Sequence, residues 1–147
     1  QPLQLEGVTP EWLRQALDKA GIKWRVIVLS SCYSGVFMPA LSTPESLVIT
    51  AAAADKTSFG CTDDADFTYF GRAFFDESLR QDNSLLAAFE SARQSISVRE
   101  KEEGFQPSEP QIQLGDKMRK VLPVLEKGLF PVMESDGEEG RPPEDQQ

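Results

Sequence analysis

Apolar residues form two short uninterrupted runs in this chain and recur at regular spacing in several other segments. The runs at residues 24–29 and 47–50 are typical of strands that are buried on both faces of a parallel sheet. Residues 110–114 alternate between apolar and polar side chains, a pattern that fits an edge strand. The pattern therefore predicts three strands.

Helical spacing, with apolar residues three and four positions apart, marks most of the intervening segments. Thr9 is a favoured N-cap residue and Pro10 suits a first turn, so a helix should begin there and end at Gly21. Other helices are predicted over residues 33–41, from Asp66 as N-cap to about Leu79, from Asn83 or Ser84 to about Glu103, and from Asp116 with an interruption at Pro123. Strands that alternate with helices indicate a parallel α/β sheet.

Two segments lack this patterning. Residues 52–66 are rich in Ala, Asp, Thr, Ser and Gly and are predicted to form a long loop, a kind of segment that often carries function. Residues 134–147 contain two Gly, two Pro, six acids and no large apolar side chain, so we expect an acidic disordered tail. The expected organisation is one folded domain, residues 1–133, followed by the tail, residues 134–147.

The composition fits a globular domain and restricts its partners. The 147 residues are 39% hydrophobic and 27% charged, which suits one domain with a real core. A net charge of −9 and a pI of about 4.5 argue against nucleic acids and anionic membranes as partners. No apolar run approaches the roughly 20 residues that span a bilayer, and no targeting leader is visible. Because the chain begins at Gln1, we expect it to be cut from a longer protein.

The candidate chemistry centres on Cys32, which follows the first predicted strand in Ser30-Ser-Cys-Tyr-Ser-Gly35. The carboxyl end of a parallel strand is where α/β folds bind ligands, and a following helix N-terminus favours the reactive thiolate. The Cys32 N–H could stabilise an oxyanion, and Gly35 would allow a tight turn beside the substrate. A buried structural cysteine is the alternative interpretation. A catalytic cysteine normally needs a base, most often histidine, and the chain has no histidine.

Three blocks in this order resemble the legumain-type cysteine peptidases, which are relatives of the caspases and gingipains. The hexapeptide ending at Gly35 resembles the family's nucleophile turn, and Val48-Ile-Thr-Ala-Ala52 resembles its next strand and the stretch after it. Thr57-Ser-Phe-Gly-Cys-Thr-Asp-Asp64 and Phe67-Thr-Tyr-Phe-Gly71 resemble the following loop and helix start. The likeness covers roughly residues 5–115 and is greatest to a bacterial branch of the family.

This resemblance implies a caspase-like three-layer α/β/α sandwich with a mostly parallel sheet, of which the chain would supply the C-terminal portion. It also implies peptide-bond hydrolysis by a His–Cys dyad, with no cofactor and no metal. The family's histidine lies at the end of the preceding strand, so we expect it upstream of Gln1, together with a second oxyanion donor. The missing N-terminal half of the domain would be a partner of this chain besides its peptide or protein substrate, and without that half the sheet would have an exposed edge.

The substrate pocket matches the family only in part. Legumain has acidic residues at the positions of Ser30 and Arg72, where they help to recognise asparagine, so we do not expect strict asparagine specificity. The resemblance implies that Thr50 and Ser58 line the pocket, with Ser58 the better candidate; loop hydroxyls that cap the backbone are the alternative. Arg72 could favour an acidic side chain or point to solvent.

The remaining conspicuous residues are assigned structural roles. Three aspartates within residues 63–66 lack the spacing of a calcium loop and are interpreted as a solvated loop, with Asp66 as N-cap. Cys61 matches a legumain cysteine but has no base near it in sequence, so it is interpreted as structural and not bonded to the candidate nucleophile. Trp12 and Trp24 are expected in the core.

Two functions remain open. The first is a cysteine endopeptidase, a hydrolase whose parent protein holds the histidine, so that the chain alone is nearly inert. The second is a non-catalytic interaction domain, a pseudoenzyme that kept the peptidase fold, and the missing histidine supports it for this chain alone. A Ser/Gly-His-Gly turn in the parent would favour the first. For localisation, the resemblance points only to the cell envelope or periplasm, where the bacterial branch is often found.

Overall fold

The computed structural model describes residues 7–60 and 68–130, and within them all three predicted strands are present. The strands are β1 (Arg25–Leu29), β2 (Ser46–Thr50) and β3 (Gln111–Leu114). The helical segments are α1 (Pro10–Lys19), η1 (Ser34–Phe37), α2 (Met38–Leu41), α3 (Tyr69–Gly71), η2 (Arg72–Ser78), α4 (Leu79–Gln81), α5 (Leu85–Glu103) and α6 (Asp116–Leu129). The predicted acidic tail, Cys61 and the aspartates within 63–66 lie outside the described residues.

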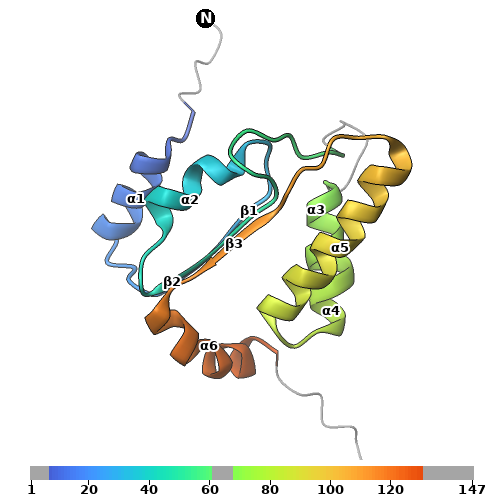
Figure 1. The fold of residues 1–147 in the computed structure, drawn as a ribbon. Helices are drawn as coiled ribbons and strands as arrows, with labels where there is room; N and C mark the ends of the chain where they lie inside the picture. The colour runs from blue at the N-terminus through green and yellow to red at the C-terminus, as the bar shows by residue number, and fades with distance from the viewer. Residues whose placement is uncertain (1–6, 61–67, 131–147) are drawn as a thin grey trace, which may run out of the picture.

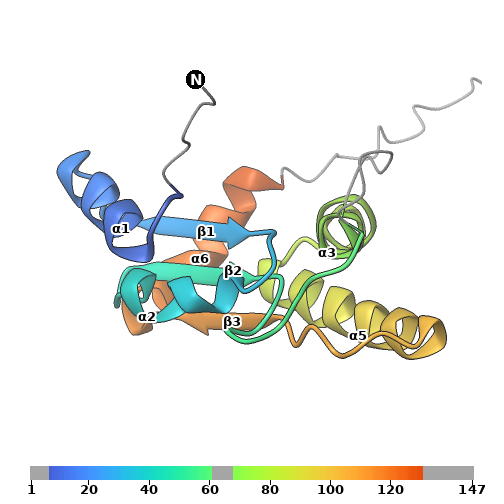
Figure 2. The same ribbon diagram turned by 90° about the horizontal axis from the view of Figure 1, so that it is seen from above.

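The strands form one sheet in the order β1-β2-β3 (Figure 1). β1 and β2 are parallel, with Leu29 beside Thr50, and β3 runs antiparallel to β2, with Gln111 opposite Thr50. Parallel neighbours need a crossover connection, which η1 and α2 provide. α1 and α2 lie on one face of the sheet, and α3 to α6 lie on the other (Figures 1 and 2). The predicted α/β sandwich, with helices on both faces of a mixed sheet, is confirmed.

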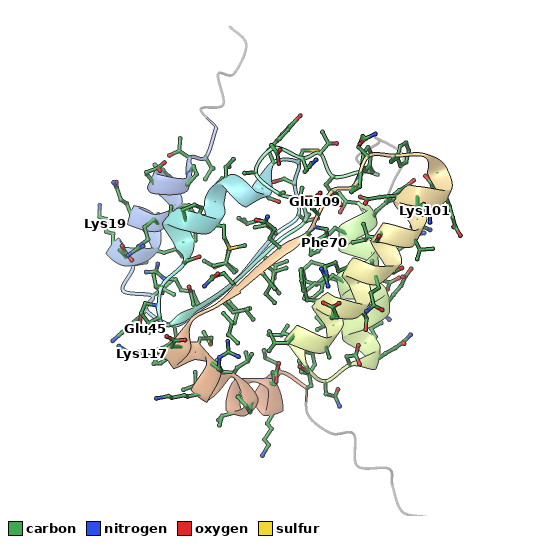
Figure 3. The ribbon with its side chains drawn as sticks, viewed as in Figure 1. Lys19, Glu45, Phe70, Lys101, Glu109 and Lys117 are labelled. Atoms are coloured by element: carbon green, nitrogen blue, oxygen red, sulfur yellow. The ribbon has the colours of Figure 1, made fainter. Side chains whose placement is uncertain are left out.

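The hydrophobic core fills the space between the sheet and the helices from α3 onward. β2 is the central strand, and all five of its residues are buried. Phe70, which projects between the sheet and the helices (Figure 3), stacks on Phe74 with 5.6 Å between ring centroids. α5 and α6 complete the core with Ala88, Phe89, Ala92, Ile96, Met118 and Leu122. This core fixes β2, and therefore the loop that follows it, against the rest of the domain.

β1 is an edge strand of the described sheet, and this position corrects two predictions. Only Arg25 of its five residues is buried, so β1 is not buried on both faces as its apolar run predicted. Trp12 and Trp24 were expected in the core but are 59% and 46% exposed. Burial of an apolar run requires a neighbouring strand and covering helices, and the described residues supply these only on the β2 side of β1.

Two helix boundaries also differ from the prediction. The helix expected after Asp66 begins at Tyr69, and its N-cap is Thr68, whose hydroxyl accepts a hydrogen bond from the Gly71 N–H at 2.9 Å. α6 is not interrupted at Pro123 but continues to Leu129. Proline removes one helical N–H donor, and because Pro123 lies on the exposed side of α6, water can satisfy the carbonyl that loses its partner.

α1 and α5 have the predicted ends. Thr9 accepts a hydrogen bond from the Trp12 N–H at 3.1 Å, and Ser84 accepts one from the Ala87 N–H at 3.4 Å. α5 ends at Gly104, whose φ of 73° is in the left-handed region that glycine adopts readily. None of the helices in the described ranges is long and apolar enough to cross a bilayer.

Candidate active site

Cys32 lies in the tight turn between β1 and η1, at the carboxyl end of the parallel strand, as predicted. Its thiol is free, and the residue as a whole is partly exposed. The next residue, Tyr33, has a left-handed backbone with φ 57°, which is uncommon for a residue with a side chain. The Tyr33 N–H donates to the Lys56 carbonyl at 2.8 Å and so ties the turn to the loop after β2.

The sulfur of Cys32 contacts both backbone groups of Ser58. The thiol donates to the Ser58 carbonyl at 3.1 Å, and the Ser58 N–H donates to the sulfur at 3.3 Å. A carbonyl oxygen has no proton to give, so its contact with the sulfur is favourable only while the thiol is protonated. The two contacts therefore fix the position of the sulfur against the backbone of the loop after β2.

Gly35 and Ser34 pack the turn that contains Cys32 against the loop after β2. A Cβ atom at Gly35 would lie 2.4 Å from the Ala54 nitrogen and 2.7 Å from the Ala53 carbonyl carbon, so only glycine fits. The Ser34 hydroxyl accepts a hydrogen bond from the Ala52 N–H at 3.2 Å. Gly35 was predicted to allow close approach to substrate, and in the structure its close approach is to the chain's own backbone.

The two loop hydroxyls predicted to line a pocket are both buried. Thr50 has no exposed surface, and its hydroxyl donates to the Ala52 carbonyl at 3.0 Å. Ser58 is 7% exposed and reaches Cys32 through its backbone rather than through its hydroxyl. Thr50 thus caps the backbone, as the alternative interpretation held, and Ser58 positions the thiol.

Ser30 and Arg72 are each hydrogen-bonded to Thr68, the N-cap residue of α3. The Ser30 hydroxyl shares a hydrogen bond of 2.8 Å with the Thr68 hydroxyl, and the Thr68 carbonyl accepts from the Arg72 N–H at 2.9 Å. Arg72 is exposed, and its guanidinium makes no ion pair with any of the described residues. Thr68 therefore links Ser30 to the first turn of the helix that carries Arg72.

An aromatic cluster attaches the loop that contains Ser58 to the end of α5. No motif in the sequence predicted this cluster. Phe59 stacks on Phe105 with 4.4 Å between ring centroids and 6° between ring planes. The Tyr69 N–H donates to the Phe59 carbonyl at 3.0 Å, and its hydroxyl donates to Glu103 at 2.6 Å. That hydrogen bond, with smaller effects of burial and of the Glu103 charge, raises the pKa of Tyr69 above its ordinary value. Because these residues are far apart in sequence, no local pattern could have revealed the cluster.

Within residues 7–60 and 68–130, no three His, Cys, Asp or Glu side chains lie close enough together to hold a metal ion. The candidate site is therefore built from one thiol, backbone groups, hydroxyls and a guanidinium. These groups suit nucleophilic attack and hydrogen bonding to an extended peptide.

An α/β sandwich with a free cysteine at the carboxyl end of a parallel strand is an arrangement that hydrolases use. Comparison with family models matches residues 1–120 to the model of the peptidase C13 family. The match covers most of the chain, and the chain belongs to this family, the legumain-type cysteine peptidases. A search of curated proteins found no match.

Proposed function

We propose that Cys32 is the nucleophile of a cysteine endopeptidase whose base is a histidine supplied from outside these 147 residues. The observation that carries the proposal is the position of the thiol, partly exposed at the carboxyl end of β1 and fixed by both backbone groups of Ser58. Membership of a cysteine peptidase family supports it. The chain contains no histidine, so the most common type of base must come from another segment.

The outer edge of β1 is the expected docking place for that segment. Trp24 and Val26 are 46% and 39% exposed there, and with Leu125 and Leu129 of α6 they line a groove of about 330 Å³. A strand added in parallel beside β1 would cover these side chains, and its carboxyl end would lie next to the end of β1. A histidine just after such a strand would be close to Cys32.

In the proposed reaction, the histidine takes the thiol proton from Cys32, and the sulfur attacks the peptide carbonyl carbon. The resulting oxyanion is held by the Cys32 N–H, which has no acceptor among the described residues, and by a second donor on the docking segment. The carbon–nitrogen bond then breaks as the imidazolium gives its proton to the leaving amine. Water, deprotonated by the histidine, hydrolyses the thioester and restores the thiol.

Ser30 and Arg72 are the proposed specificity residues. Both carry no negative charge, so neither can orient the amide NH₂ of asparagine as a carboxylate would. Arg72 instead favours an acidic substrate side chain, because a guanidinium forms a charge-assisted hydrogen bond with a carboxylate. Ser58 lies in the loop that holds the thiol and would be next to the substrate. The Thr50 hydroxyl already donates a hydrogen bond to the Ala52 carbonyl.

The second candidate function is a non-catalytic interaction domain with the same fold. The observation that favours it is the absence of any histidine from the chain. The parent coding sequence upstream of Gln1 separates the two candidates. A Ser/Gly-His-Gly turn there supports the peptidase, and its absence supports the interaction domain.

The test of the peptidase is reconstitution. We expect the purified chain to be nearly inert, because a general base contributes about 10²–10⁴-fold to the rate. Adding the histidine-bearing segment should restore cleavage of a fluorogenic peptide library, with acidic side chains preferred and no near-exclusive cutting after asparagine. Cys32→Ala should abolish this cleavage, and Ser31→Ala, a change at the exposed neighbouring residue, should not. Turnover by the chain alone that Cys32→Ala removes would contradict the need for the outside base.

A further inference from the structure

A groove lies between α5 and the segment that leads into β3. It has a volume of about 770 Å³ and is lined on one side by Ser97, Val98 and Glu100 of α5 and on the other by Pro107, Glu109, Pro110 and Gln111. In Figure 2, β3 and α5 lie on the opposite side of β2 from β1. The groove shares no lining residue with β1 or with the candidate site around Cys32.

The groove carries negative charge that the described residues do not neutralise. Glu100 is 4% exposed, and its carboxylate accepts the Ser108 N–H with both oxygens at 3.1 Å. Glu109 is exposed on the segment between α5 and β3 (Figure 3). No Lys or Arg nitrogen of the described residues forms a salt bridge with either carboxylate. Arg93, the only cation lining the groove, is paired with Glu90 at 2.7 Å, so its charge is already balanced.

The strand beside the groove has an unused hydrogen-bonding edge. β3 pairs with β2 on one side, and no strand in the described part of the chain pairs with the other side. Gln111, the first residue of β3, lines the groove. An extended peptide added to such an edge gains main-chain hydrogen bonds from the strand and selectivity from the neighbouring pocket.

Charge decides between the possible occupants. Residues 134–147 of the same chain contain six acids and one Arg. This segment therefore does not complement the charge of a groove whose two carboxylates form no salt bridge with the described residues. A second copy of the chain, with a net charge of −9, would bring like charges together if the same edge paired with itself. A basic peptide avoids both penalties.

We propose that the groove between α5 and β3 binds an extended basic segment of a partner protein, which adds to β3 as a strand and places a Lys or Arg side chain against Glu100 and Glu109. The proposal does not depend on the peptidase activity. It requires only the groove, the open edge of β3 and the two carboxylates.

The test uses a fluorescein-labelled octapeptide in which lysine alternates with valine, and the full chain as it exists. Binding is measured by fluorescence anisotropy against a matched peptide in which glutamate replaces lysine. The lysine peptide should bind, and the glutamate peptide should not. Glu109→Lys should raise the Kd of the lysine peptide by at least about tenfold, because a hydrogen bond to a charged group is lost and repulsion is added. Glu11→Lys, the same charge change on exposed α1, should alter it by less than about twofold.

A lysine peptide N-methylated at alternate residues tests the strand pairing, and it should bind at least about tenfold more weakly, since several backbone donors are removed. Equal affinity for the N-methylated and the unmethylated lysine peptide would overturn the pairing with β3. Equal effects of Glu109→Lys and Glu11→Lys would place the peptide elsewhere and overturn the site. A dimer in sedimentation velocity that the peptide dissociates would assign the groove to a second copy of this chain instead.

Discussion

Single residues around Cys32 act mainly through the backbone. Ser58 holds the thiol with its N–H and carbonyl, and Ser34 accepts the Ala52 N–H. Gly35 contributes by having no side chain, because the loop after β2 occupies the place where a Cβ would be. The thiol is thus positioned by contacts that depend on close packing of two loops.

Gly35→Ala tests this packing at the scale of one residue. The new methyl group would meet backbone atoms that cannot rotate away, so the free energy of unfolding should fall by about 1–3 kcal/mol. Gly128→Ala is the matched control, since no atom lies within 4 Å of the position a Cβ would take there. Because alanine favours helices, the control should be neutral or more stable by up to about 1 kcal/mol. Urea unfolding measures the free energy of unfolding of both variants. Equal values would show that the two loops accommodate the methyl group without loss of stability.

At the scale of elements, charged groups help to attach α1 to the sheet. Asp18 accepts a hydrogen bond from Arg14 Nε at 2.8 Å and another from the guanidinium of Arg25, which is buried on β1. The hydrogen bond with Arg25 is the main cause, and that with Arg14 the second, of a pKa of Asp18 below its ordinary value. No residue of α1 is fully buried, so the hydrogen bond between Asp18 and Arg25 contributes to docking α1 on the sheet beside its half-buried apolar residues.

Asp18→Asn should reveal this attachment as a dependence of stability on pH. Since folding lowers the pKa of Asp18, its stabilising effect is present above the ordinary titration range of aspartate and is lost as the pH falls below about 4. The variant should therefore be less stable than the parent at pH 7, and the difference should shrink toward pH 3. Asp55→Asn, at an exposed loop aspartate, is the control. Urea unfolding at each pH measures the effect, and a difference that does not change with pH would rule out the ionised carboxylate as its source.

For the whole molecule, the two edges of the described sheet differ in character. The β1 side exposes Trp24 and Val26, together with Leu125 and Leu129 across the groove. The groove on the β3 side combines carboxylates and glutamines with Val98 and two prolines. Exposed apolar side chains gathered along one sheet edge are typical of a surface that another segment covers.

Tryptophan fluorescence tests whether the histidine-bearing segment covers the β1 edge. The chain has two tryptophans, and Trp24 is the one that lines the groove beside β1. In a Trp12→Phe variant, the emission of Trp24 should be that of a hydrated indole and should shift to shorter wavelength when the segment binds. A Trp24→Phe variant should show a smaller shift on binding. Restored cleavage with no change in Trp24 emission would place the segment elsewhere.

The sequence alone determined the features that depend on near neighbours along the chain. Apolar runs and alternation located all three strands. Helices begin at Thr9 and Ser84 and one ends at Gly104, as predicted, because periodicity and capping are local properties. The motif around Cys32 indicated the family, and the composition showed that the chain cannot supply its own histidine.

The tertiary structure decided everything that depends on contacts between distant segments. Thr68 rather than Asp66 caps α3, and its hydroxyl also bonds Ser30, 38 positions earlier in the chain. An apolar run cannot by itself show whether a neighbouring strand covers it, so the exposure of β1 was visible only in the fold. The hydrogen bonds between Ser58 and Cys32 likewise join residues 26 positions apart, and Ser58 makes them with its backbone N–H and carbonyl. Nearly all residues carry these groups, so no side-chain pattern predicts which of them will pair.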